Sequence, residues 1–173
     1  MNSYPEIIID QQKIKKSFSH FFNYWNWELH FTFSFHRHVN SRQAFKEVKR
    51  WLKKKRHRFR KIKFGALIIY SNPNYDNPHV HMVAVSDPRY PRRLTDISPK
   101  LLRFIELSWE LNSFNNRKKY WEDRTCRITT NEQWTNKTLC NYVSKPKNIP
   151  LLKPDQWDID VYRAPLLEAL RSH

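Results

Sequence analysis

Residues 27–35 alternate between apolar and polar side chains, and this alternation constrains the fold more than any other feature of the sequence. The apolar positions are Trp27, Leu29, Phe31, Phe33 and Phe35. The positions between them are Glu28, His30, Thr32 and Ser34. A period of two residues is typical of a β-strand with one buried face and one polar face. The sequence therefore predicts a strand that contributes one face to a core.

The rest of the chain alternates between helical and strand patterns. Apolar residues at spacings of three and four predict helices over 42–58, 99–112 and 132–145. Apolar runs predict strands over 64–70, 79–85 and 127–130. The expected N-caps are Asn40 or Ser41, Ser98 and Asn131. The order β-α-β-β-α-β-α, with a hairpin between the second and third strands, predicts an α+β fold in which helices pack on one face of an antiparallel sheet.

Length and composition predict one folded domain with a polyanionic partner. The chain has 173 residues and a formal charge of +16. Such an excess of positive charge indicates nucleic acid, with an anionic membrane surface as the lesser alternative. Aromatic residues make up 15% of the chain, and aromatic rings combined with basic groups suit single-stranded nucleic acid. We expect an N-terminal arm or short helix over 1–26, the main domain over 27–147 and a C-terminal extension over 148–173.

Other features exclude several classes of protein. Gly65 is the only glycine, which argues against the glycine-rich phosphate loops of NTPases and Rossmann oxidoreductases. The two cysteines, Cys126 and Cys140, form neither a disulfide framework nor a zinc-finger pattern. No apolar run approaches a membrane span, and Asp10 interrupts the apolar run of residues 7–9 that would have to serve as a signal peptide. We therefore expect a cytoplasmic protein that does not bind a membrane.

The predicted helix over 42–58 is strongly basic on its polar side. Its candidate phosphate-binding residues are Lys46, Lys49, Arg50, Lys53 and Lys54. A run of charges is usually a solvated face, but few acidic residues offset this one. Both interpretations remain open: a contact to the phosphate backbone of nucleic acid, or a solvated helix.

Two histidines in the third predicted strand form a candidate metal site. His79 and His81 flank Val80, and Asn77 and Pro78 precede them. Alternate residues of a strand share a face, so both imidazoles can reach a common point. Neutral imidazole is a good ligand for a divalent ion such as Mn²⁺ or Zn²⁺. The alternative is a polar strand edge with two solvated histidines.

A tyrosine and a lysine in the last predicted helix form a candidate catalytic pair. Tyr142 and Lys145 are three residues apart and therefore share a helix face. A phenol with its usual pKa of about 10 is a poor nucleophile, but a nearby cation makes its attack on a phosphate feasible. The lysine can hold a phosphate, stabilise a phenolate or protonate a leaving oxygen. The alternative is a packed tyrosine with a solvated lysine.

These three motifs, in this order, resemble those of the HUH endonucleases. The likeness is greatest to rolling-circle replication initiators of plasmids and small viruses that use one catalytic tyrosine. The alternating strand of that family corresponds here to residues 29–35, and its His-hydrophobic-His strand to residues 79–81. Its Tyr-x-x-Lys helix corresponds to residues 142–145. The resemblance covers roughly residues 27–147.

The resemblance implies a ferredoxin-like βαββαβα sheet and a specific chemistry. His79 and His81 would bind a divalent ion, Mn²⁺ or Mg²⁺, which polarises the scissile phosphate of single-stranded DNA. Tyr142 would attack and form a 5′-phosphotyrosine, leaving a free 3′-hydroxyl, with help from Lys145. Thr32 and Ser34 would contact the DNA beside the site. The implied partners are an origin in single-stranded or hairpin form and a host helicase and polymerase.

One departure from the family leaves alternatives open. Many such initiators have an acidic third ligand late in the strand before the histidine strand, but residues 66–71 contain no carboxylate. Asp76, His30 or water alone remain as candidates for the third ligand. Single-tyrosine transposases and conjugative relaxases share this chemistry, although the three clustered histidines usual in relaxases are missing. A non-catalytic single-stranded DNA-binding protein on the same scaffold is the alternative from a different class.

Overall fold

The computed structural model describes residues 11–35, 38–55, 58–59, 61–72, 78–110, 126–143, 157–164, 166 and 168. These residues form an α+β fold, as predicted. Its elements are α1 (Gln11–Phe22), β1 (Leu29–Ser34), α2 (Ser41–Lys54), β2 (Phe64–Ser71), β3 (His79–Ser86), the 3₁₀ turn η1 (Leu94–Asp96), α3 (Pro99–Glu110), β4 (Cys126–Thr130), α4 (Asn136–Val143) and β5 (Trp157–Tyr162). Within the described parts of the chain, no helix is both long and apolar enough to cross a bilayer.

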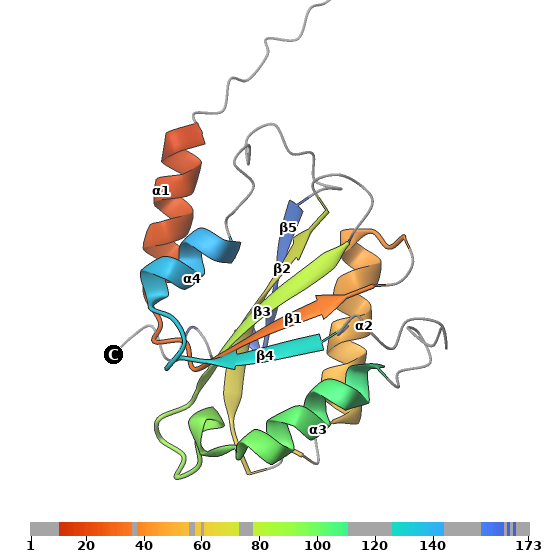
Figure 1. Cartoon of the computed structure of the whole chain (residues 1–173). Helices are drawn as coiled ribbons and strands as arrows, with labels where there is room; N and C mark the ends of the chain where they lie inside the picture. The colour runs from red at the N-terminus through yellow and green to blue at the C-terminus, as the bar shows by residue number, and fades with distance from the viewer. Residues whose placement is uncertain are drawn as a thin grey trace, which may run out of the picture.

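The strands form one five-stranded antiparallel sheet in the order β4-β1-β3-β2-β5 (Figure 1). The predicted hairpin between β2 and β3 is confirmed, with Phe64 opposite Ser86 and Ser71 opposite His79. Strand β5 was not predicted. It lies in the segment 148–173, where prolines surround a six-residue alternation of apolar and acidic or polar side chains. That segment thus supplies an edge strand, paired with β2, to the main sheet.

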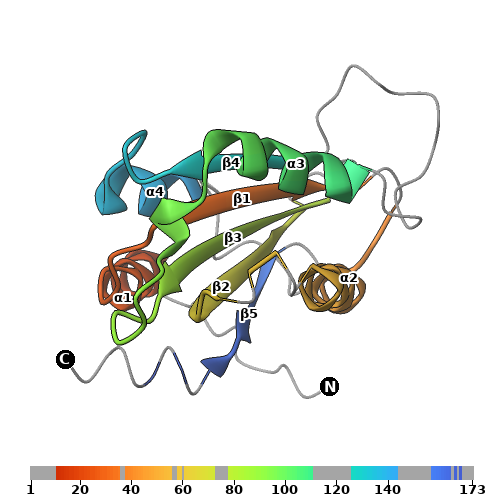
Figure 2. The same ribbon diagram turned by 90° about the horizontal axis from the view of Figure 1, so that it is seen from below.

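Helices cover both faces of the sheet, so the prediction that they pack on one face was wrong. Helices α2 and α3 pack on one face against residues such as Phe31 and Ile68. Helices α1 and α4 pack on the other face against residues such as Leu67 and Val83 (Figure 2). All eight residues of β2 are buried, because a continuous apolar run has side chains to bury on both sides. A sheet with two apolar faces needs a layer on each.

Two of the three predicted helix starts are confirmed. Asn40 caps α2 in a reciprocal pair: its Oδ1 accepts the Gln43 N–H at 2.9 Å, and its own N–H donates to Gln43 Oε1 at 3.1 Å. Ser98 precedes α3, and its hydroxyl accepts the Leu101 N–H at 3.3 Å. Both starts follow from local sequence, because the cap and its partner lie within three residues of each other.

The start of α4 differs from the prediction. Asn131 does not cap the helix. Its N–H donates to the backbone oxygen of Glu28 at 3.1 Å, which extends the pairing of β4 with β1. Helix α4 begins instead at Asn136, where the Thr135 hydroxyl accepts the Thr138 N–H at 3.2 Å. The intervening turn shortens the helix and sets the position of Tyr142 relative to the sheet.

A buried carboxylate ties the loop after β3 to the start of β1. Glu28 accepts hydrogen bonds from the Ser86 hydroxyl at 2.6 Å and the Leu94 N–H at 3.2 Å, and it pairs with Arg93. We expect Glu28→Ala to lower the free energy of unfolding by about 2–3 kcal/mol, because it leaves the buried Ser86 hydroxyl without its acceptor and removes the carboxylate that pairs with Arg93. Urea denaturation measures this loss. The exposed Glu132→Ala serves as the control, with an expected change within about 0.5 kcal/mol. An equal effect of both substitutions would contradict the role given to Glu28.

Candidate active site

Neighbouring strands bring three histidines together on one face of the sheet. In the register of β1 and β3, Thr32 lies opposite His81 and Ser34 lies opposite His79. Alternation then places His30, two residues before Thr32, on the same face. His30 Nε2 lies 3.1 Å from His81 Nδ1, and the rings of His79 and His81 are 4.9 Å apart. The structure thus joins the predicted histidine pair to a third imidazole.

Helix α4 places Tyr142 against this histidine cluster. Leu139, Cys140 and Val143 are buried and fix the helix against α1 and the sheet. The Tyr142 ring lies 5.1 Å from the His81 ring and 5.7 Å from the His30 ring, in edge-to-face geometry with both. Tyr142 is nevertheless 43% exposed, so the residue is partly open to solvent.

The three histidines differ in how deeply they are buried. His81 is 4% exposed and His30 is 6% exposed, whereas His79 is half-buried. His81 is covered by the ring of Tyr142, which packs against it from α4 although the two residues are more than fifty positions apart in the sequence. His79, the first residue of β3, is the least buried residue of that strand.

The three candidates for a third metal ligand have different outcomes. His30 lies within the cluster, and Asp76 lies outside the described residues. Two imidazole nitrogens bound to one ion at about 2.1 Å each lie roughly 3 Å apart, which the His30–His81 distance matches. Among the described residues, however, no group of three or more His, Cys, Asp or Glu side chains has the arrangement of a metal site. The 3.1 Å contact is also a hydrogen-bond distance between the two rings, and His79 is the next imidazole along β3.

A chain of polar contacts holds His30 in place. The Trp134 Nε1–H donates to the Thr129 hydroxyl at 3.2 Å, and that hydroxyl lies 3.3 Å from His30 Nδ1. Burial, and to a smaller extent the positive charge of Arg127, lowers the pKa of His30 from 6.5 to about 4. His30 is therefore neutral near pH 7, which is the form that binds a metal ion. A partner on the second ring nitrogen orients such a ligand.

Strand β4 adds a cation to the site that the sequence analysis did not single out. Arg127 lies opposite Thr32, which lies opposite His81, so the three form one row across the sheet. Thr32 Oγ1 is 3.5 Å from His81 Nδ1, and Arg127 is exposed. The sequence of residues 126–130 does predict that Arg127 and Thr129 share a face, because alternate residues of a strand point to the same side. What the sequence lacked was the pairing of β4 with β1.

The basic residues of α2 do not lie at this site. Helix α2 packs on the opposite face of the sheet, with α3. Lys49 pairs with Asp160 at 2.6 Å and Arg50 with Glu47 at 2.7 Å. The other predicted DNA-binding residues of this helix, Lys46, Lys53 and Lys54, are exposed. Any DNA contact through α2 is therefore separate from the histidine cluster.

Two further residues named in the sequence analysis fall outside the part of the chain that the structure describes. Lys145 lies outside the described residues, as does Asn77. Thr32 and Ser34 lie beside the histidines, as the resemblance implied. The arrangement places three imidazoles beside a partly exposed phenol, with a guanidinium and two hydroxyls in the same rows of the sheet. No protein-family model, no curated protein and no solved structure matches this chain.

Proposed function

We propose that this chain is a metal-dependent endonuclease of the HUH type, which nicks and rejoins single-stranded DNA to initiate rolling-circle replication of a plasmid or virus. One observation carries the proposal: the Tyr142 ring contacts the rings of both His30 and His81. These residues come from three elements, α4, β1 and β3, that are distant in the sequence. A phenol next to imidazoles that can bind a metal ion is the arrangement that metal-assisted attack on a phosphate needs.

The proposed step is a transfer of the phosphoryl group to tyrosine. The Tyr142 oxygen attacks phosphorus, and the bond from phosphorus to the 3′-oxygen of the preceding nucleotide breaks. The phenol loses its proton and the departing oxygen gains one, so the products are a 5′-phosphotyrosine and a 3′-hydroxyl. A divalent ion held by His81, His30 and His79 would supply Lewis-acid polarisation of the phosphate. The resemblance to the HUH endonucleases suggests Lys145 as the residue that donates a proton to the departing 3′-oxygen.

The polar residues around the cluster have defined tasks in this proposal. The hydroxyls of Thr32 and Ser34 can donate to phosphate oxygens, which position a strand without reading its bases. The Arg127 guanidinium stabilises the negative charge that develops on the phosphate. Thr129 keeps the His30 ring in one orientation. Each of these residues acts from a strand, which holds a reactive geometry more rigidly than a loop does.

A cleavage assay tests the proposal. The chain is incubated with a pool of single-stranded oligonucleotides and Mn²⁺, and the products are separated on a denaturing gel. We expect shortened DNA together with a slowly migrating protein–DNA adduct, and we expect EDTA to remove both. Full cleavage in EDTA would contradict the metal dependence, and retained binding without any cleavage would contradict the enzyme.

A second candidate function is non-catalytic binding of single-stranded DNA. Residues 66–71 contain no carboxylate, and the described residues contain no group of three arranged ligands. A scaffold that had lost its metal would keep its positive charge and its affinity for DNA. The cleavage assay separates the two candidates, because only the enzyme forms an adduct.

The exposed lysines of α2 lead to a prediction about salt dependence. We expect Lys46→Gln, Lys53→Gln and Lys54→Gln together to make the slope of log affinity against log salt concentration less negative by about 2, since each phosphate contact on a single strand contributes about −0.7. Fluorescence anisotropy with a labelled oligonucleotide measures the slope. The matched control neutralises Lys16, Lys100 and Lys137, which are also exposed and lie outside α2. An unchanged slope in the α2 variant would show that this helix is only a solvated face.

A further inference from the structure

A cavity of about 470 Å³ lies away from the histidine cluster and is lined by basic residues. Arg58 and Lys61 come from the segment between α2 and β2, and Arg92 comes from the segment between β3 and α3. Ile62 and Ile97 supply apolar wall, and both belong to the core on the α2–α3 face. Folding therefore brings cations together from two segments that are about thirty residues apart in the sequence.

The charges around this cavity are unbalanced. Asp96 is the one acidic residue in its lining, and its carboxylate already accepts the Arg93 N–H at 2.7 Å. None of the ion pairs found between described residues includes Arg58, Lys61 or Arg92. Like charges in a concave site repel one another, and an anion bound between them relieves that repulsion. Guanidinium groups suit phosphate in particular, because they donate two parallel hydrogen bonds.

An exposed aromatic ring lies at the edge of this cavity. Phe104 is 49% exposed and sits one helical turn after Leu101, which lines the cavity. The Arg58 guanidinium lies 4.6 Å from the centre of the Phe104 ring, so the ring holds one of the cations in place. A basic groove next to an exposed aromatic ring is the usual arrangement for single-stranded nucleic acid, where bases stack and cations contact phosphates.

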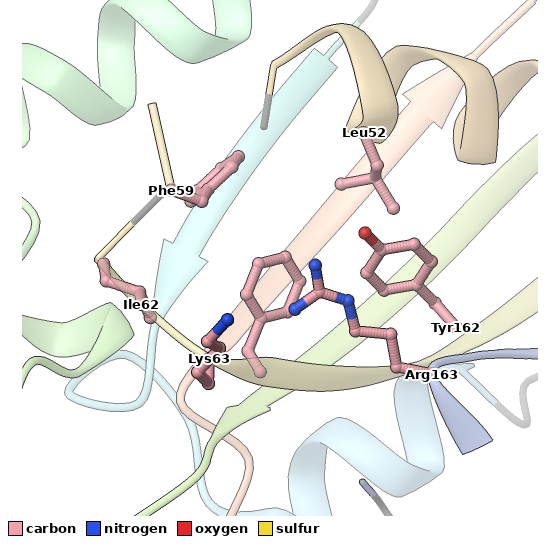
Figure 3. Close-up of a pocket in the computed structure, with 7 residues that line it drawn as sticks. Leu52, Phe59, Ile62, Lys63, Tyr162 and Arg163 are labelled. Atoms are coloured by element: carbon pink, nitrogen blue, oxygen red, sulfur yellow. The ribbon is translucent and has the colours of Figure 1, made fainter. Parts of the chain in front are cut away.

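The positive charge continues into a neighbouring, smaller cavity. This second cavity, of about 90 Å³, shares Ile62 with the first and is also lined by Lys63 and Arg163 (Figure 3). The Arg163 guanidinium stacks 5.2 Å from the Tyr162 ring and 5.8 Å from the Phe64 ring. The smaller cavity has no room for a nucleotide, but its two cations extend the basic surface on which a strand would lie.

We propose that the larger cavity is a second binding site for single-stranded DNA, in which Arg58, Lys61 and Arg92 bind phosphate groups and Phe104 stacks on a base. The site is distinct from the proposed nicking site. His79 begins β3, whereas the cavity is lined by residues that precede β2 and residues that follow β3. The start of β2 pairs with the end of β3, and an eight-residue strand spans about 26 Å. The inference goes beyond the proposed function, since it requires neither Tyr142 nor a metal ion.

The test measures binding of the full chain to a fluorescein-labelled oligothymidylate in EDTA, so that failure of the proposed nicking cannot affect the result. The variant combines Arg58→Gln, Lys61→Gln and Arg92→Gln. We expect at least a ten-fold loss of affinity, and a slope of log affinity against log salt concentration that is less negative by about 2. The control combines Lys16→Gln, Arg42→Gln and Lys137→Gln, which removes the same charge elsewhere and is expected to cost less than three-fold.

Phe104→Ala gives an independent test that leaves the net charge unchanged. We expect about a ten-fold loss of affinity for the oligonucleotide, with a smaller change in the salt slope than in the cation variant. Thermal unfolding of each variant verifies that the fold is retained. Equal losses in the two charge variants, together with no effect of Phe104→Ala, would overturn the proposal.

Competition identifies the source of the phosphate. Unlabelled oligothymidylate is expected to displace the probe, whereas inorganic phosphate and thymidine monophosphate at the same phosphate concentration are expected not to do so. Displacement by the monophosphate that is as effective as displacement by the oligonucleotide would assign the cavity to a free nucleotide, and would contradict a strand-binding site.

Discussion

Replacing Tyr142 with phenylalanine is expected to abolish the nick and the covalent protein–DNA adduct, with a loss of at least about a thousand-fold in cleavage rate. The substitution removes the attacking oxygen and keeps the ring, so the ring contacts with His30 and His81 are retained. Affinity for the oligonucleotide is therefore expected to remain within about two-fold, since binding uses phosphate contacts that the substitution leaves in place.

Two other tyrosines provide matched controls for this prediction. Tyr24 and Tyr90 are 44% and 43% exposed, almost the same as Tyr142, but neither has a ring contact with the histidine cluster among the described residues. Tyr90→Phe and Tyr24→Phe are expected to cleave and to form the adduct at the wild-type rate. Loss of the adduct in either control, with retention in Tyr142→Phe, would show that exposure alone had been mistaken for reactivity.

Replacing His81 with alanine is expected to abolish Mn²⁺-dependent cleavage and to weaken Mn²⁺ binding by at least about a hundred-fold. His81 is at the centre of the site: its Nδ1 lies 3.1 Å from His30 Nε2 and 3.5 Å from Thr32 Oγ1, and its ring contacts those of His79 and Tyr142. Calorimetric titration with Mn²⁺ gives a readout that does not depend on cleavage.

Burial of His81 requires a control for stability. The substitution leaves a small cavity and removes the partner of a buried imidazole, so we expect a loss of about 1–3 kcal/mol in the free energy of unfolding. His79→Ala, at a half-buried position, is expected to lose metal binding with less effect on stability. His38→Ala, at an exposed position outside the cluster, is expected to change neither. Unchanged Mn²⁺ affinity in both His79→Ala and His81→Ala would contradict the proposed metal site.

Features that depend on near neighbours in the sequence could be predicted from it. The alternation over 27–35 predicts strand β1 and its polar face, because a two-residue period of apolar side chains is typical of a β-strand. The apolar runs on either side of the short loop before His79 give the hairpin of β2 and β3. The shared face of His79 and His81 also follows from strand geometry alone.

Features that depend on distant pairing could not be predicted. The contact between His30 and His81 requires β1 to lie beside β3 in one particular register, which the single sequence does not specify. The same limit applies to Arg127, since its place in the row with Thr32 depends on the pairing of β4 with β1. His30 was therefore only one of three candidates for a third ligand, and Arg127 was not a candidate at all.

The wrong prediction that the helices cover one face has a physical cause. The amphipathic pattern of α2 identifies its buried side, but it does not identify which face of the sheet that side covers. The apolar residues of β2 require helices on both faces of the sheet, but the number of predicted helices does not say which helix covers which face. Because α1 and α4 occupy the face with the histidines, Tyr142 reaches the cluster, and the basic side of α2 lies on the far side of the sheet.

The most direct test of the central claim is to map the tyrosine in the trapped adduct. The wild-type chain is incubated with single-stranded oligonucleotides and Mn²⁺, the adduct is digested with a protease and a nuclease, and the nucleotide-linked peptide is sequenced by mass spectrometry. The proposal predicts one modified peptide, with a 5′-phosphate linked to Tyr142. A link to any of the other seven tyrosines, such as Tyr70 or Tyr75, would contradict it, and so would the absence of an adduct with every oligonucleotide and metal tested.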